Sequence, residues 1–335
     1  MKTKSKTILI TILFLAISIT VILLLYGRRF PKAASKQLFA MDTSVSITAD
    51  QKHIGDYINL IKSLDKKLSA YDEQSEISRL NHDKILSVSD DTAELLKKAS
   101  EFCRKYPEVD ITAGALTELW NVNGQDPTVP KDSDIKTALK SVGIHNLLLN
   151  GNSAELKNNA KIDLGSCAKG YALDLLYDKI KNNNDNYAIV SFGSSSLLFG
   201  RKPDGSDFVT SILNPDDKSS EVLHFKTGEG FVSTSGGYER FFEADGKKYS
   251  HIMDLKTGYP VETDLTSVTI VSETDGMLTD FMSTCIFIGG TQKIGDYLNN
   301  DSFQVIAIDK DKNIYCSKSF KDKIEITDKN YRFKH

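Results

Sequence analysis

An unbroken apolar run near the N-terminus, from Ile8 to Tyr26, constrains this chain more than any other feature. Its nineteen residues carry no charge. At about 1.5 Å of rise per residue, a helix of this length just crosses a hydrocarbon core of about 30 Å. A cleavable secretory signal has a shorter apolar region that ends in small residues, whereas this run continues directly into Gly27-Arg28-Arg29. We therefore expect a single-pass transmembrane anchor over residues 8–26, with a signal segment, cleaved or uncleaved, as the alternative.

The anchor divides the chain into four expected parts. These are a cytoplasmic tail over residues 1–7, the anchor over 8–26, a polar tether over 27–38 and a folded domain over 39–330. Basic residues flank both ends of the apolar run, so the positive-inside rule does not indicate which end faces the cytoplasm. Long domains are translocated largely regardless of their charge. We therefore expect the domain on the extracytoplasmic side of the cell membrane.

The charge of the domain excludes one large class of partner. Residues 33–335 carry 36 Lys and Arg against 45 Asp and Glu, a net charge of −9. Affinity for a nucleic-acid backbone comes mainly from cationic side chains, so nucleic acid is an unsuitable partner. A domain of this charge that handles phosphates is expected to use a metal ion or backbone N–H groups.

The four cysteines give no metal or redox motif. Cys103, Cys167, Cys285 and Cys316 form no C-x-x-C pair. An exported chain permits disulfides, but this spacing indicates none in particular, and we expect buried free thiols.

Hydrophobic periodicity indicates an α+β fold. Apolar residues at steps of three and four predict a helix that begins at Ile54 and ends near Tyr71. Further helices are predicted from Ser89, from Ser133 to Gly143, and over 167–182, 276–288 and 291–299. Short apolar runs predict strands over 39–49, 146–150, 154–157, 187–191, 208–213, 222–226 and 231–235. Helices and strands come in blocks rather than in alternation. We therefore expect a single domain with a largely antiparallel sheet and packed helices.

Three polar clusters stand out, although each has an ordinary structural explanation when taken alone. A Gly-containing turn precedes a helix that carries Lys169, where free N–H groups and an ammonium group suit an anion. His251 lies near the end of a strand and has the pKa range of a general base. Asp280 and Thr284 are four residues apart on one helix face, and their oxygens suit Mg²⁺.

Seven short motifs follow one another along the domain. They are Met41-Asp42-Thr43, Leu68 to Tyr71 with Ser75 to Asn81, Val109 to Thr112 with Leu119-Trp120, Asp163 to Tyr171, Thr234 to Tyr238, His251 to Pro260, and Asp280 to Thr284. In this order the chain resembles the FAD:protein FMN transferase (ApbE) family from about Phe39 to Gly290. The resemblance implies an ApbE-like, T-fold-like α+β domain.

The resemblance also implies an activity: Mg²⁺-dependent transfer of FMN from FAD to a Ser or Thr hydroxyl of an exported target protein, with release of AMP. By the family's pattern, the FAD site is lined by Met41, Tyr71, Asp110, Asp163 and Lys169. The metal ligands are Ser166, Asp280 and Thr284, and the base is His251. The expected target is an extracytoplasmic electron-transfer protein.

Two departures from the family's pattern are notable. Asp42 replaces the usual Gly, which places a carboxylate on the expected path of the FAD phosphates, and Gly193-Ser194-Ser195 stands where a Gly-Gly pair is common. Two alternative functions remain open. One is a pyrophosphatase that cleaves FAD to FMN and AMP, and the other is a non-catalytic FAD-binding protein at the cell surface.

Overall fold

The computed structural model describes residues 17–18 and 32–334. The segment expected to form the anchor, residues 8–26, therefore lies almost entirely outside the described residues, as does the tail over residues 1–7. Within the described part of the chain, no helix combines the length and apolar character that crossing a membrane requires.

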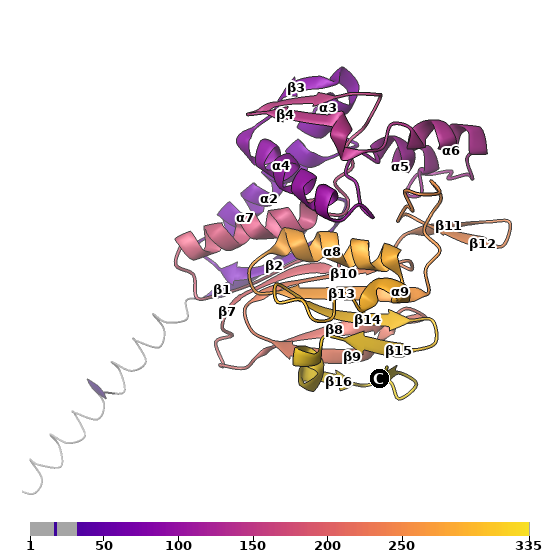
Figure 1. Ribbon diagram of the computed structural model, residues 1–335. Coiled ribbons are helices and arrows are strands. Elements are labelled where there is room, and N and C mark those ends of the chain that lie inside the picture. The colour runs from indigo at the N-terminus through magenta and orange to yellow at the C-terminus, as the bar shows by residue number, and fades with distance from the viewer. Residues whose placement is uncertain (1–16, 19–31, 335) are drawn as a thin grey trace, which may run out of the picture.

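A nine-stranded sheet forms the centre of the molecule (Figure 1). In spatial order its strands are β1 (Ala33–Ala40), β2 (Thr43–Asp50), β6 (Tyr187–Phe192), β7 (Ser195–Gly200), β10 (Gly230–Gly236), β13 (Leu265–Ser272), β14 (Gln304–Asp309), β15 (Asn313–Cys316) and β17 (Arg332–Phe333). All neighbouring pairs are antiparallel except β15 and β17. The prediction of a largely antiparallel α+β fold is confirmed.

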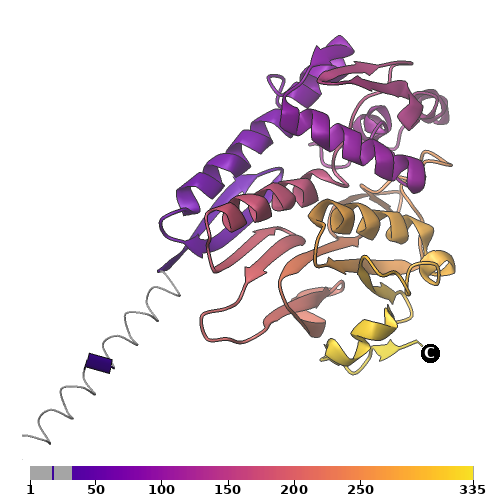
Figure 2. The ribbon, with the colours of Figure 1, turned by 60° about the vertical axis from the view of Figure 1, so that its left-hand side comes forward.

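Helices cover one face of this sheet, and a small second sheet covers the other (Figures 1 and 2). The covering helices are α2 (Ile54–Leu68), α7 (Ala168–Asn182) and α8 (Gly276–Gly289), followed by the short α9 (Thr291–Ile294). The helix α4 (Asp90–Lys105) packs on α7 and α8 on their side away from the sheet (Figure 2). The second sheet contains β8 (Phe208–Asn214), β9 (Asp217–Thr227) and β16 (Ile324–Ile326), with a 3₁₀ turn over Lys318–Lys323.

Side-chain alternation in the central strands builds the two separate cores. Leu197 of β7 packs with the helices, whereas its neighbour Leu198 packs with the second sheet. Phe231 and Val232 of β10 divide in the same way, as expected for a strand with a period of two. The sheet is thus buried on both faces.

Smaller elements extend the helical layer at its far side from the sheet. They are α3 (Glu76–Asp83), α5 (Gly114–Trp120), α6 (Asp132–Leu139), a 3₁₀ turn over Ile144–Asn146, and a sheet of β3 (Ile85–Ser87), β4 (Leu147–Asn150) and β5 (Ser153–Leu156). A hairpin of β11 (Phe241–Ala244) and β12 (Lys247–Ser250) lies below them (Figure 1). Three of the four free cysteines are buried as predicted, whereas Cys316 is partly exposed.

Several predicted boundaries are wrong. Residues 33–38, expected as part of the tether, belong to β1, because main-chain pairing with β2 stabilises a mostly exposed polar edge strand. The predicted strand over 39–49 is two strands joined by a turn at Met41 and Asp42. Ser133 does not cap α6, which begins at Asp132 and ends at Leu139. The helix expected over 291–299 ends at Ile294.

The helices α7 and α8 cross at a contact between their main chains. A Cβ atom on Gly170 would lie 2.3 Å from the carbonyl oxygen of Gly276. Asp174 of α7 accepts hydrogen bonds from the N–H groups of Gly276 (2.6 Å) and Met277 (3.1 Å), and Lys98 of α4 lies 3.3 Å from the same carboxylate. The start of α8 is therefore fixed onto α7 by close packing and by hydrogen bonds.

Gly170→Ala is expected to destabilise the protein by roughly 1–3 kcal/mol, because the added methyl group meets main chain that cannot rotate away. The matched control is Gly55→Ala in α2, where nothing lies within 4 Å of the new Cβ. This control should leave stability unchanged or raise it by up to about 1 kcal/mol. Urea unfolding of the three proteins measures both effects, and equal midpoints would contradict the tight crossing.

Candidate active site

The buried carboxylate of Asp280, on α8, is the centre of a polar cluster at the α7–α8 crossing. It is 5% exposed. Its Oδ2 accepts a hydrogen bond from the N–H of Gly170 (3.0 Å), and its Oδ1 accepts one from the hydroxyl of Ser195 (3.1 Å). The ammonium group of Lys169 lies 3.2 Å from Oδ1. A buried carboxylate requires such partners, and this one receives them from two elements, α7 and β7.

Thr284 and Ser166, the other two predicted metal ligands, lie on α8 and in the turn before α7. Thr284 lies one turn after Asp280 on α8, with its hydroxyl 3.1 Å from that of Ser235. Ser166 lies in the turn that leads into α7, where the carbonyl of Leu164 accepts the N–H groups of residues 167 and 168. All three residues offer oxygen ligands, the type that Mg²⁺ prefers. The donor set therefore fits this cation.

Asp163 and Asp110, both predicted for the FAD site, lie on neighbouring segments. The N–H of Asp163 donates to the carbonyl of Ile111 (2.8 Å). The carboxylate of Asp163 accepts from the hydroxyl of Thr117 and from the N–H of Gly165, each at 2.7 Å. The carboxylate of Asp110 accepts hydrogen bonds from the main-chain N–H and the hydroxyl of Thr112, two residues further along the chain.

His251, the predicted base, follows β12 and is held by one carbonyl group. Its main-chain N–H (3.1 Å) and its ring Nδ1 (3.2 Å) both lie at hydrogen-bond distance from the carbonyl oxygen of Arg240. A carbonyl oxygen only accepts, so Nδ1 carries the proton and Nε2 keeps its lone pair. Burial lowers the pKa of His251 to about 4, and the positive charges of Arg240 and Lys169 act in the same direction. The ring is therefore neutral near pH 7.

Met41 and Tyr71 lie at the edge of this cluster. Met41 and Asp42 form the β1–β2 turn with φ values of 50° and 61°, and the N–H of Met41 donates to Asp65 of α2 (2.7 Å). Tyr71 follows α2 and is 73% exposed. Its hydroxyl is within electrostatic reach of Asp163 and Asp42, so an aromatic face is available beside the carboxylates.

Three residues of the cluster were not predicted as site residues. Ser195 binds Asp280, Arg240 holds His251, and Glu239 lies within electrostatic reach of Arg240 and Asp280. Desolvation of the carboxyl raises the pKa of Glu239, although the charge of Lys169 acts against this rise. All three stand inside polar stretches that the sequence singled out. Their place in these stretches was the signal in the sequence, and it did not reveal which of the residues there make contacts in the cluster.

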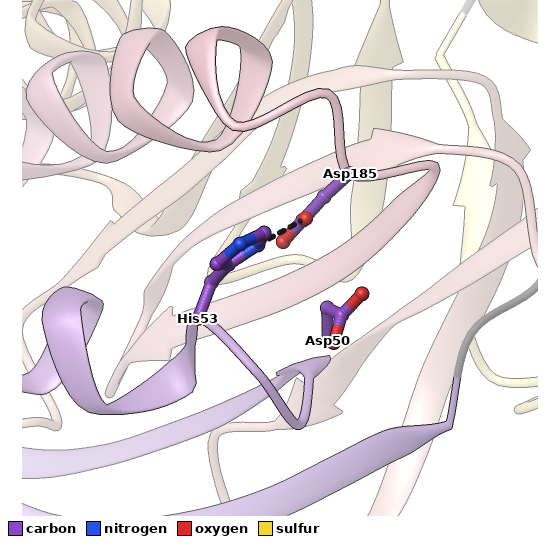
Figure 3. A group of neighbouring side chains, drawn as sticks. All are labelled: Asp50, His53 and Asp185. Atoms are coloured by element: carbon purple, nitrogen blue, oxygen red, sulfur yellow. Dashed lines mark hydrogen bonds and ion pairs between the residues drawn. The ribbon is translucent and has the colours of Figure 1, made fainter.

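A second group of titratable side chains lies at the opposite end of strands β2 and β6. Single ligand atoms of Asp50, His53 and Asp185 all lie within 4.8 Å of one another (Figure 3). The buried Asp185 is already paired, with Nδ1 of His53 (2.7 Å) and the hydroxyl of Tyr57 (2.6 Å). Strand β2 separates this group from the turn at Met41 by about 23 Å, at about 3.3 Å per residue. It is distinct from the Asp280 cluster.

Comparisons with known proteins identify the family of this chain. The model of the ApbE family matches residues 41–308. The FAD:protein FMN transferase of Haemophilus influenzae is 26% identical over 293 residues, which cover 83% of this chain and 84% of that protein. The ApbE protein of Thermotoga maritima superposes with a TM-score of 0.79 at 29% identity, covering 87% of this chain and 99% of that one. The flavin transferase ApbE of Vibrio cholerae gives a TM-score of 0.76 at 26% identity, over 87% and 99% of the two chains. The chain therefore belongs to the ApbE family.

Proposed function

We propose that this protein transfers FMN from FAD to a Ser or Thr hydroxyl of an exported target protein and releases AMP. The names of its relatives support this activity. The observation that carries it is the neutral His251, with Nε2 available as a base, in the same polar cluster as Asp280 and Lys169. A hydroxyl is a poor nucleophile until a base takes its proton.

In the proposed reaction, the acceptor oxygen forms a bond to the FMN phosphorus of FAD. The bond from that phosphorus to the bridging oxygen breaks, and AMP leaves with this oxygen. The proton of the acceptor hydroxyl passes to Nε2 of His251, which the carbonyl of Arg240 holds in the required tautomer. Met41, Tyr71, Asp110, Asp163 and Lys169 are proposed to hold FAD.

Ser166, Asp280 and Thr284 are proposed to hold Mg²⁺. When bound, this cation neutralises phosphate charge. A domain with a net charge of −9 otherwise provides little positive charge for this purpose. Lys169 supplies a fixed positive charge beside Asp280. The exposed ring of Tyr71 offers a stacking face for the flavin or adenine ring.

We further propose that residues 8–26 anchor the protein in the cell membrane, with the domain over residues 39–330 on the extracytoplasmic side. The apolar run supports this location. The proposed partner is then an exported electron-transfer protein that carries the acceptor Ser or Thr. Hydrolysis of FAD to FMN and AMP, and storage of intact FAD, are the alternative activities.

Residues 33–335, incubated with FAD, Mg²⁺ and an exported FMN-binding domain, are expected to add one covalent FMN to the acceptor. Intact mass spectrometry measures the gain, and AMP is followed in parallel. EDTA should abolish both products. AMP and free FMN without a modified acceptor would indicate the pyrophosphatase, and intact FAD throughout would indicate a binding protein.

Asp280→Asn is expected to remove Mg²⁺-dependent turnover, because an amide keeps the shape of the side chain but is a weak ligand for a hard cation. The matched control is Asp185→Asn, another buried carboxylate that lies outside the cluster. Turnover is measured against Mg²⁺ concentration for both variants. Loss of Mg²⁺ dependence in the Asp185 variant alone would move the metal site to the other end of the sheet.

The rate constant kcat/KM of the wild type is expected to stay level from pH 8 to about pH 5 and to fall near pH 4, where His251 becomes protonated. His251→Ala should lower kcat by about 10²–10⁴-fold and change the Kd for FAD far less. The control is His224→Ala, a histidine bonded to Glu221 in the second sheet. A titration near pH 6.5 that disappears in the His251 variant would contradict the low pKa.

A further inference from the structure

The guanidinium group of Arg240 is held by Asp42 across the edge of the active site. One terminal nitrogen lies 3.2 Å from the Asp42 carboxylate, and the other donates to the carbonyl oxygen of Asp42 at 2.6 Å. Both ends of the guanidinium fork are thus engaged by a single residue. Arginine uses the same terminal nitrogens to bind phosphate oxygens.

Arg240 is one of two cations that converge on the site. Lys169 and Arg240 both act electrostatically on His251 and on Glu239, so both charges lie near the same pair of side chains. Lys169 is paired with the proposed metal ligand Asp280. Arg240 is paired only with Asp42 among the ion pairs of the described residues. Arg240 can therefore exchange Asp42 for another anionic partner without disturbing Asp280.

We propose that Asp42 is an internal competitor for the diphosphate of FAD. In the free protein its carboxylate occupies the Arg240 fork in place of a phosphate oxygen, and it gives up this contact when FAD binds. Asp42 thereby limits the affinity of the site for its substrate. This inference rests on the proposed function, since it takes FAD as the substrate.

The exposure and the backbone of the pair suit an exchangeable contact. The side chains of Arg240 and Asp42 are 37% and 49% exposed, and ion pairs of this kind are weak because water competes for both charges. Asp42 has a φ of 61°, a conformation that Asn adopts as readily as Asp. Asp42→Asn therefore removes the charge without straining the turn.

The test measures binding of FAD and of riboflavin, which has no diphosphate, by flavin fluorescence. Asp42→Asn is expected to lower the Kd for FAD by about 3–10-fold and to leave the Kd for riboflavin unchanged. Arg240→Lys should raise the Kd for FAD, because an ammonium group lacks the fork. When Asp42→Asn is added to Arg240→Lys, it should increase the affinity for FAD by less than half as much as it does alone.

The control is Glu262→Gln, which breaks another exposed ion pair, that of Glu262 with Lys247, and should leave both Kd values unchanged. An unchanged or higher Kd for FAD in Asp42→Asn would overturn the proposal. So would a full gain in the Arg240→Lys background, since that result indicates general charge repulsion. A wild type that binds no FAD would instead overturn the proposed function.

Discussion

The main-chain contact between Gly170 and Gly276 sets the geometry on which the active site depends. Helix α7 carries Lys169 and begins at the turn that contains Ser166, while α8 carries Asp280 and Thr284. The distance between the helices therefore decides whether the Asp280 carboxylate reaches the N–H of Gly170, which it does at 3.0 Å. Any side chain at the crossing would push these groups apart. The packing of two helices thus determines the electrostatics of the site.

Desolvation by the surrounding protein, rather than any single charge, has the largest effect on the pKa values in the polar cluster. It raises the pKa of Glu239 and of the Cys167 thiol and lowers that of His251 to about 4. Carboxylates in such a place need cations, and Lys169 and Arg240 supply only two. In the proposed reaction an added cation would supply the further positive charge, while His251 stays neutral and Cys167 stays protonated.

Local patterns predicted α2, α7 and α8 well, because their apolar residues recur at helical spacing or follow clear turn signals. Strands β13 and β14 went unpredicted, since both of their faces are buried and no alternation remains in the sequence. The residues of the proposed chemistry came from the ordered motifs of the family, not from periodicity. Ser195 and Arg240 were missed because their contacts join positions 85 and 198 residues apart, which no local pattern reveals.

The edge strand β1 has a consequence for where the reaction takes place. It begins at Ala33, separated by the six residues 27–32 from the segment proposed to enter the membrane, and ends at Ala40, beside the turn that bears Met41 and Asp42. Eight extended residues cover about 26 Å, and pairing with β2 along their whole length makes this distance rigid. Under the proposed anchoring of residues 8–26 in a bilayer, this strand would contribute a fixed part of the distance between the active site and the lipid surface. Acceptor hydroxyls would be selected partly by how far they stand from the membrane.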